Sequence, residues 1–205
     1  GLGPSSSMRI NYSNGVDKYY EERGSHYRNP HTAAIEKCIH AMFEAVDLKA
    51  RINCMSWKVL DLAAGSGEAT IACRKWAEMS SISLPVMSAV DPYTKKAFES
   101  CVPDVTCQEM TFHDVAQGLL KETFDIVVSS FALHLMSQSE LFSTLFQLSL
   151  QCRYLVILSP HKLPLVPPYT YGWDLIHQLY TSGSGNARVR GRVYQSSQFP
   201  SCNHY

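Results

Sequence analysis

The sequence predicts an α/β protein with a single doubly wound, mostly parallel sheet of six to seven strands and helices on both faces. Short apolar segments alternate along the chain with segments of helical period, which is typical of a parallel sheet. The segment 124–129 is apolar with almost no polar alternation, as a strand covered on both faces should be. At 205 residues, the chain is long enough for one core and too short for two ordinary domains.

The expected elements follow one another in a regular order. We expect strands at 58–63, 85–90, 105–111, 124–129, 153–158 and 188–195. We expect helices that begin at Asn29 as N-cap, at Glu68, at Thr94, at the capping box Ser137–Glu140, and at Trp173. Because only one clear strand follows the fifth, we expect the C-terminal part of the sheet to be short or rearranged. The aromatic residues of the last helix, Trp173 and Tyr180, are expected in the core.

The domain boundaries follow from these elements. We expect a tag or disordered leader at 1–8, an N-terminal lid segment and helix at 9–50, the ligand-binding domain at 51–196 and a tail at 197–205. In the last strand, Arg188, Arg190 and Arg192 alternate and so share one face. They either contact phosphate or mark a solvated edge strand that discourages aggregation, and the second interpretation is the simpler one.

Composition narrows the class of protein. Lysines plus arginines equal aspartates plus glutamates at 18 each, so no strong nucleic-acid signature is present. The seven cysteines are scattered without a Cys-x-x-Cys pair, which favours free thiols over disulfides or a metal site. No apolar stretch reaches the roughly 18 residues of a membrane span. We therefore expect a cytoplasmic or nuclear protein with no metal and no membrane partner.

The first glycine-rich turn, which runs from Asp61 to Glu68, is the place to look for a ligand, because parallel sheets bind ligands at the carboxyl ends of their strands. A dinucleotide loop has a third glycine or alanine where this chain has Thr70. The carboxylate of Asp61 would repel a diphosphate and attract a cation. Asp91, at the end of the next strand, can accept hydrogen bonds from both hydroxyls of a ribose. This set fits a positively charged nucleoside better than NAD.

Four segments then resemble the signatures of class I S-adenosylmethionine-dependent methyltransferases, in the right order over roughly residues 55 to 160. They are Val59–Gly67, Ala89–Tyr93, Phe112–Val115 and Phe124–Met136. The resemblance implies S-adenosylmethionine as cofactor and S-adenosylhomocysteine as product. The cofactor-binding residues it implies, in chain order, are Asp61, Ala63, Gly65, Gly67, Asp91, Pro92, Tyr93, His113, Asp114, Ser129 and Ser130.

By this resemblance, the glycine turn packs against the methionine part of the cofactor, and Asp61 lies near its charged end. Asp91 holds the ribose, and Pro92 or Tyr93 packs against the adenine, whose amino group donates to Asp114. Ser129 or Ser130 lines the methyl-transfer site.

Two further groups of residues have two readings each. Tyr20, Tyr27 and Arg28 belong to a leading segment that resembles the lid of many such enzymes; the tyrosines alternatively staple this segment to the sheet. His134 and His161 follow predicted strands and are candidate bases, or they orient loops.

The leading hypothesis is therefore an active methyltransferase, and the alternative is a catalytically silent cofactor-binding domain that acts on a partner protein. Ser129-Ser-Phe-Ala differs from the Asn/Asp-Pro-Pro-aromatic segment associated with methylation of base amino groups, and no Pro-Cys pair is present for attack on a pyrimidine. Small-molecule, protein and some RNA acceptors remain open.

Overall fold

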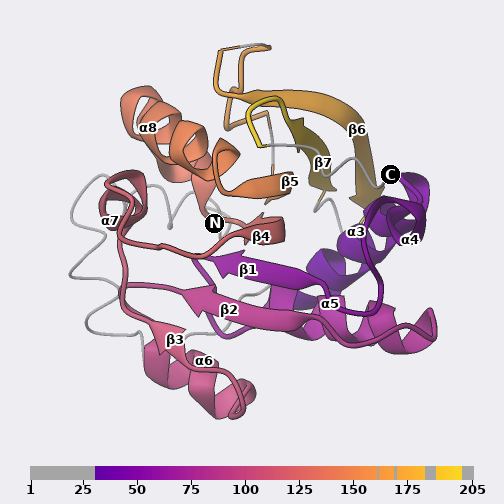
Figure 1. Ribbon diagram of the computed structural model, residues 1–205. Helices are drawn as coiled ribbons and strands as arrows, with labels where there is room; N and C mark the ends of the chain where they lie inside the picture. Colours follow the sequence, from indigo (N-terminus) through magenta and orange to yellow (C-terminus); the bar gives the residue numbers. More distant parts are fainter. Residues whose placement is uncertain (1–30, 161, 169, 183–187, 200–205) are drawn as a thin grey trace, which may run out of the picture.

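A computed structural model of the protein describes residues 31–160, 162–168, 170–182 and 188–199. The strands of these residues form one seven-stranded sheet (Figure 1). In chain order, they are β1 (Lys58–Leu62), β2 (Val86–Val90), β3 (Cys107–Gln108), β4 (Phe124–Ser130), β5 (Cys152–Ser159), β6 (Trp173–Ser182) and β7 (Arg188–Ser196). Their order across the sheet is β3-β2-β1-β4-β5-β7-β6. The strand order reverses between β1 and β4, where open sheets of this type bind ligands.

The sheet is mixed. Strands β1 to β5 are parallel to their neighbours, whereas β7 is antiparallel to both β5 and β6. The expectation of a mostly parallel sheet with helices on both faces therefore holds for the first five strands, and an antiparallel hairpin completes the sheet at the β5 side.

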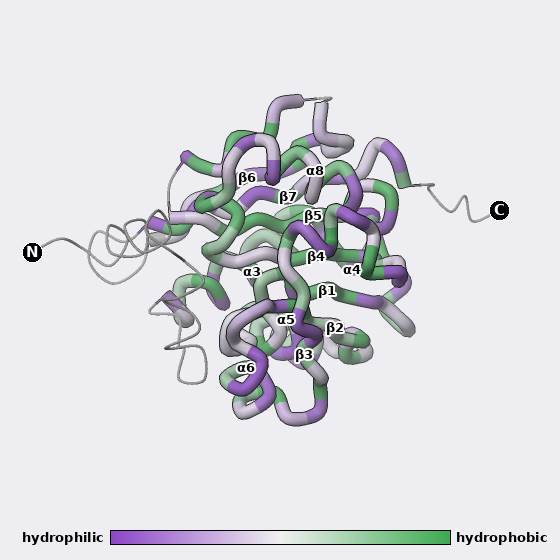
Figure 2. The backbone as a smooth tube through the Cα atoms, turned by 90° about the vertical axis from the view of Figure 1, so that its left-hand side faces the viewer, coloured by the Kyte–Doolittle hydropathy of each residue, from purple (hydrophilic) through white to green (hydrophobic). Residues whose placement is uncertain are grey.

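Helices cover both faces of the sheet. They are α3 (Thr32–Ala45), α4 (Leu48–Arg51), α5 (Glu68–Met79), α6 (Lys95–Cys101), α7 (Phe112–Ala116) and α8 (Gln138–Ser149), with a short 3-10 helix η2 (Leu133–Leu135) after β4. Figure 1 shows α3 and α5 on one side of the sheet and α7 and α8 on the other. Val59 and Val128 pack with the first pair of helices, and Leu60 and Val127 with the second. This alternation follows from the two-residue period of a strand, and β4 and β5 are predominantly hydrophobic (Figure 2).

Most expected helices form, with shifted ends. The helices that follow the glycine turn and Thr94 are confirmed, and Ser137 and Glu140 form both bonds of the expected capping box. The first described helix has His31 rather than Asn29 as its N-cap. Strand β3 is much shorter than expected, because Thr111 starts a second capping box and directs the chain into α7.

The expected helix from Trp173 to Tyr180 is wrong, because this segment is β6 and pairs with β7 along its length. Its aromatic and β-branched residues suit a strand, but an edge strand with one bulge has no clean alternation. The sheet is therefore complete rather than shortened. Trp173 is buried as expected and donates from Nε1 to the Leu145 carbonyl at 2.8 Å, whereas Tyr180 is 51% exposed and lies outside the core.

Strand β7 is an inner strand, so the interpretation of its arginines as a solvated edge is also wrong. It lies between β5 and β6, and Arg192 is buried. Gly191 faces α3, where an added Cβ would contact the Met42 sulfur and lie 2.6 Å from the Cys38 sulfur. The absence of a side chain at Gly191 therefore allows α3 to pack closely on this part of the sheet.

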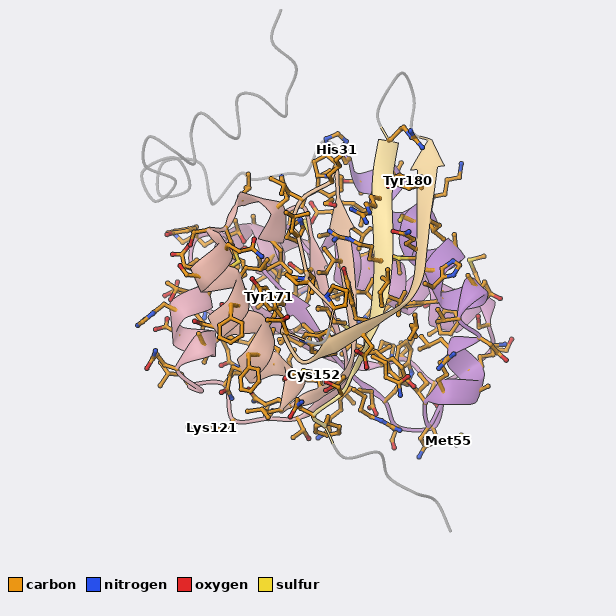
Figure 3. The ribbon with its side chains drawn as sticks, turned by 90° about the horizontal axis from the view of Figure 1, so that it is seen from above. His31, Met55, Lys121, Cys152, Tyr171 and Tyr180 are labelled. Carbon is orange, nitrogen blue, oxygen red and sulfur yellow. The ribbon has the colours of Figure 1, made fainter. Side chains whose placement is uncertain are left out.

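Figure 3 shows the two ends of the strands well separated. His31 and Tyr180 lie at the end where the parallel strands finish, and Met55 and Lys121 lie at the opposite end, where strands begin. In the part of the chain that the structure describes, no helix is long and apolar enough to cross a membrane.

Candidate functional site

The turn between β1 and α5 has an unusual backbone. Ala63, Gly65 and Gly67 have φ angles of 58°, 58° and 90°, in the left-handed region that favours glycine. At Gly67, an added Cβ would lie 2.8 Å from Cγ2 of Val102, so α6 packs directly against the turn. Ala63 has a Cβ in this conformation, which costs about 1–2 kcal/mol in an L-residue. The surrounding contacts therefore hold the turn in a fixed, close-fitting shape.

Asp91 ties this turn to the end of β2. Its Oδ2 accepts from the backbone N–H of Gly65 at 3.1 Å, and its Oδ1 accepts from those of Tyr93 at 2.8 Å and Thr94 at 3.0 Å. Burial raises the pKa of Asp91, and these bonds act in the opposite direction. A carboxylate has about four acceptor positions. Three are used by the backbone, so Asp91 retains capacity for one more donor, such as a hydroxyl.

Asp61 lies beside Asp91 on the same face of the sheet and is fully buried. Its Oδ2 accepts from the backbone N–H and the hydroxyl of Thr70, at 3.1 and 2.7 Å. Its Oδ1 has no hydrogen-bond partner among the described residues. Burial, above all, raises the pKa of Asp61 to about 8, with a contribution from the nearby carboxylates of Glu68 and Asp91 and against the hydrogen bonds from Thr70. Asp61 is thus mainly protonated at neutral pH.

The end of β4 forms the other side of the switch point. Ser129 and Ser130 are buried, and the hydroxyl of Ser129 has no partner among the described residues. Phe131, which follows, has a φ of 56°. Its ring stacks on His31 at 4.6 Å between centroids and meets His134 edge-on at 6.4 Å. Burial lowers the pKa of His31, which keeps its imidazole neutral and able to accept a proton at pH 7.

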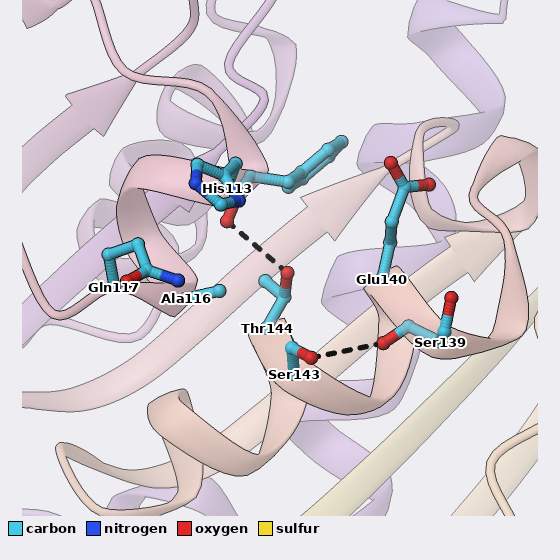
Figure 4. Close-up of a pocket in the computed structure, with 8 residues that line it drawn as sticks. His113, Ala116, Gln117, Ser139, Glu140, Ser143 and Thr144 are labelled. Atoms are coloured by element: carbon cyan, nitrogen blue, oxygen red, sulfur yellow. Dashed lines mark hydrogen bonds between the residues drawn. The ribbon is translucent and has the colours of Figure 1, made fainter.

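The structure does not bring every expected residue into this network. Asp114 caps its own helix, with its carboxylate accepting from Thr111 N at 2.9 Å, and its described interactions are with Thr111 and His113. His113 is exposed and lines a separate pocket of about 270 Å³ between α7 and α8 (Figure 4). The eight lining residues are Phe112, His113, Ala116, Gln117, Ser139, Glu140, Ser143 and Thr144. In this pocket, the Thr144 hydroxyl donates to the Phe112 carbonyl at 3.3 Å. The pocket therefore lies at the contact between the two helices.

The remaining expected residues divide into two groups. Pro92 and Tyr93 are half-buried in the turn that Asp91 organises, next to the glycine turn. The residues expected in the lid, and one candidate base, lie outside the described residues: Tyr20, Tyr27, Arg28 and His161.

Two residues at the end of β4, His31 and Phe131, have no clear signal in the sequence that would place them in the site. His31 reaches Phe131 only because α3 packs across the sheet, and a stack between residues 31 and 131 has no local pattern. The left-handed backbone of Phe131 is equally invisible in the sequence, because aromatic residues rarely adopt it. The expectation of a ligand at the ends of β1, β2 and β4, in contrast, needed only local strand patterns.

The chemistry of this site favours a cationic, hydroxyl-bearing ligand. A buried carboxyl with an orphaned oxygen lies beside a turn that is held without bulky side chains. A diphosphate at the N-terminus of α5 would meet buried Glu68 in the first turn and Asp61 beneath it. Helix N-termini bind phosphates well when such acidic groups are absent. The donor set therefore fits a sulfonium nucleoside and disfavours a dinucleotide.

Comparisons with known proteins agree with this geometry. No family model matches the chain. An uncharacterized protein of Schizosaccharomyces pombe is 34% identical over 199 residues, which cover 82% of this chain and 80% of that protein.

Among solved structures, the magnesium protoporphyrin IX methyltransferase of Synechocystis with bound SAM superposes with a TM-score of 0.58 and 16% identity, covering 96% of this chain and 99% of that one. The N-methyltransferase NodS of Bradyrhizobium japonicum in complex with S-adenosylhomocysteine gives a TM-score of 0.55 and 11% identity, covering 93% and 97%. These similarities show that the fold is that of the class I methyltransferases.

Proposed function

Since the chain belongs to the same family as the fission yeast protein and has the class I methyltransferase fold, we propose that it transfers the methyl group of S-adenosylmethionine to an acceptor. The observation that carries the proposal is the junction of the glycine turn, Asp61 and Asp91 at the switch point of the sheet. The solved neighbours named above were crystallised with this cofactor or its product, which supports the same choice here.

We assign roles to the residues that lie at this junction. Ala63, Gly65 and Gly67 form the backbone against which the methionine part packs. Asp61 has an oxygen without a donor in the described part of the chain, and this side chain becomes a carboxylate as the cation binds. Asp91 supplies its remaining acceptor position to a ribose hydroxyl while it holds Gly65 in place. Because binding ionises Asp61, it should release a proton below about pH 8.

Pro92 and Tyr93 are the proposed platform for the adenine, because they follow Asp91 directly. We do not assign Asp114 the adenine contact that its motif implied, because its carboxylate caps α7. The lid role of Tyr20, Tyr27 and Arg28, which the resemblance implies, stays a prediction. The role of His161 as a base also stays a prediction.

The transfer itself needs positioning more than chemical assistance. When bound, S-adenosylmethionine supplies an electrophilic methyl group on a cationic sulfur. The chain holds the reacting groups in line, and orientation of this kind contributes about 7–11 kcal/mol in favourable cases. Ser129 and Ser130 line the approach at the end of β4. His134 and His31, on two sides of the Phe131 ring, are the candidate bases for an acceptor that starts protonated.

Incubation with methyl-labelled S-adenosylmethionine and fractionated cell extract tests the proposal. We expect label to appear in one class of acceptor, small molecule, protein or RNA, and to disappear when the protein is omitted. A parallel titration with NADH should show no binding. Cofactor binding without transfer to any fraction would favour the silent, partner-regulating domain, and preferential NADH binding would overturn the assignment altogether.

A further inference from the structure

Arg192 is a buried cation on an inner strand of the sheet. Only 2% of its surface is exposed. Its Nη1 donates to the Pro164 carbonyl at 2.6 Å and to the Tyr194 hydroxyl at 3.2 Å. Its Nε and Nη2 are buried with no hydrogen-bond partner among the described residues. One edge of the guanidinium is therefore satisfied, and the other edge is not.

No acid among the described residues balances the charge of Arg192. None of their carboxylates forms an ion pair with it, and the charged side chain that acts on it is another cation, Arg190. Burial, followed by the repulsion from Arg190, lowers the pKa of Arg192, but a guanidinium stays protonated at pH 7. Burial of an unpaired cation is strongly unfavourable, and such groups are normally paired or hydrogen-bonded. An anion is the partner that would supply both the missing hydrogen bonds and the balancing charge.

The unsatisfied edge has the geometry that oxyanions bind. The N–H bonds of Nε and Nη2 are nearly parallel and form one side of the planar guanidinium. Two parallel donors on one side match the two oxygens of a carboxylate or of a phosphate group. Arg190 adds to the positive charge: it donates to the Lys162 carbonyl and to Gln178, while its own Nε is buried without a partner in the described part of the chain.

The register of the sheet places these arginines near the proposed transfer site. Arg192 is opposite Ile157 of β5, which is opposite Ser129 of β4, so the three residues share one face. Ser129 also has an orphaned hydroxyl on this face. Arg190 lies one row nearer the carboxyl edge, opposite Tyr180 of β6, and Figure 3 shows Tyr180 at the same end of the molecule as His31.

We propose that Arg192, supported by Arg190, binds an oxyanion group, a carboxylate or a phosphate, of the methyl acceptor. The assignment of the anion to the acceptor rests on the proposed function, whereas the anion site rests on the geometry alone. A purely structural role for Arg192, as a clamp on the Pro164 carbonyl, accounts for Nη1 and leaves its other edge unexplained. The methyl acceptor is therefore an acidic molecule or segment rather than a neutral or cationic one.

Thermal unfolding in matched salts tests the site. The probes are about 50 mM sodium phosphate and sodium acetate, each compared with sodium chloride at equal ionic strength. We expect one oxyanion to raise the Tm of the wild-type protein in a saturable way, by at least ~3 °C. Phosphate and acetate are the two arms that separate a phosphate-bearing acceptor from a carboxylate-bearing one.

Two variants and a control make the result specific. Arg192→Met should abolish the oxyanion shift and leave the Tm in chloride equal to or above that of the wild type, because it removes an unpaired buried charge. Arg192→Lys retains the charge without the paired donors and should lose most of the shift. Arg188→Met, at the exposed end of the same strand where Arg188 lies over the Tyr180 ring, should retain the full shift.

A shift that survives in both Arg192 variants, no shift in the wild type, or a Tm of Arg192→Met in chloride far below that of the wild type would overturn the inference. A titration of each variant with S-adenosylmethionine separates this result from the proposed function. If the wild type fails to bind the cofactor, the proposed function fails; if it binds the cofactor but ignores both oxyanions, only the acceptor inference fails.

Discussion

The carboxyl group of Asp61 links the stability of the protein to pH. Its ordinary pKa is 3.8, and burial raises it to about 8 in the folded chain. Between these values, the folded state retains a proton that the unfolded state has lost. The contribution of Asp61 to stability is therefore greatest below about pH 4 and is lost as the pH rises toward 8.

The variant Asp61→Asn should remove this dependence, because the amide keeps the shape of the side chain and cannot ionise. We expect the free energy of unfolding of the variant, relative to the wild type, to increase by about 2 kcal/mol between pH 5 and pH 7. Urea denaturation at the two pH values measures the difference. Parallel pH curves for the two proteins would refute the raised pKa.

Asp104 is a control for Asp61, because its pKa is shifted in the opposite direction. It is exposed and bonded to Arg74, and this hydrogen bond lowers its pKa. Its contribution is present above its ordinary pKa and is lost only as the pH falls. Asp104→Asn should therefore leave the stability difference between pH 5 and pH 7 unchanged.

At the scale of elements, the contact between α3 and β7 depends on the bare backbone of Gly191. A Cβ at this position would overlap the sulfur atoms of Met42 and Cys38. We expect Gly191→Ala to destabilise the protein by about 1–3 kcal/mol, as overpacking of a core does. Chemical denaturation measures this loss.

Gln195→Ala is the matched control, because Gln195 is exposed on the same strand, and it should change stability by less than about 0.5 kcal/mol. An equal effect of the two substitutions would mean that α3 does not press on Gly191. Because α3 also places His31 against Phe131, Gly191→Ala should disturb the aromatic stack at the end of β4 as well.

The elements that could be predicted from sequence are those with local signals. The apolar strands β1, β2, β4 and β5 and the capping boxes and glycines around them place Asp61, Gly65 and Asp91 at one edge without any tertiary information. The strand β6 could not be predicted in this way, because its hydrogen bonds come from β7 and its exposed face mixes Leu175 and Tyr180 with polar residues. The burial of Arg192 depends on that same pairing.

At the scale of the whole molecule, the sheet order is what turns scattered residues into a site. β1 lies between β2 and β4, so the glycine turn, Asp91 and Ser129 meet at one edge although about 65 residues separate the first from the last. The hairpin of β6 and β7 then brings Arg190 and Arg192 to the face of the sheet that Ser129 shares. The proposed cofactor-binding residues and the proposed acceptor-binding arginines thus lie on neighbouring strands, toward the carboxyl ends of the parallel strands.

Isothermal titration of S-adenosylmethionine into the wild-type protein, Asp91→Asn and Asp104→Asn tests this account most directly. The amide cannot replace the carboxylate that accepts from Gly65, Tyr93 and Thr94. We predict saturable binding to the wild type, affinity at least tenfold weaker in Asp91→Asn, which corresponds to about 1.4 kcal/mol, and wild-type affinity in Asp104→Asn. Absence of binding to the wild type, or equal affinity of the wild type and Asp91→Asn, would contradict it.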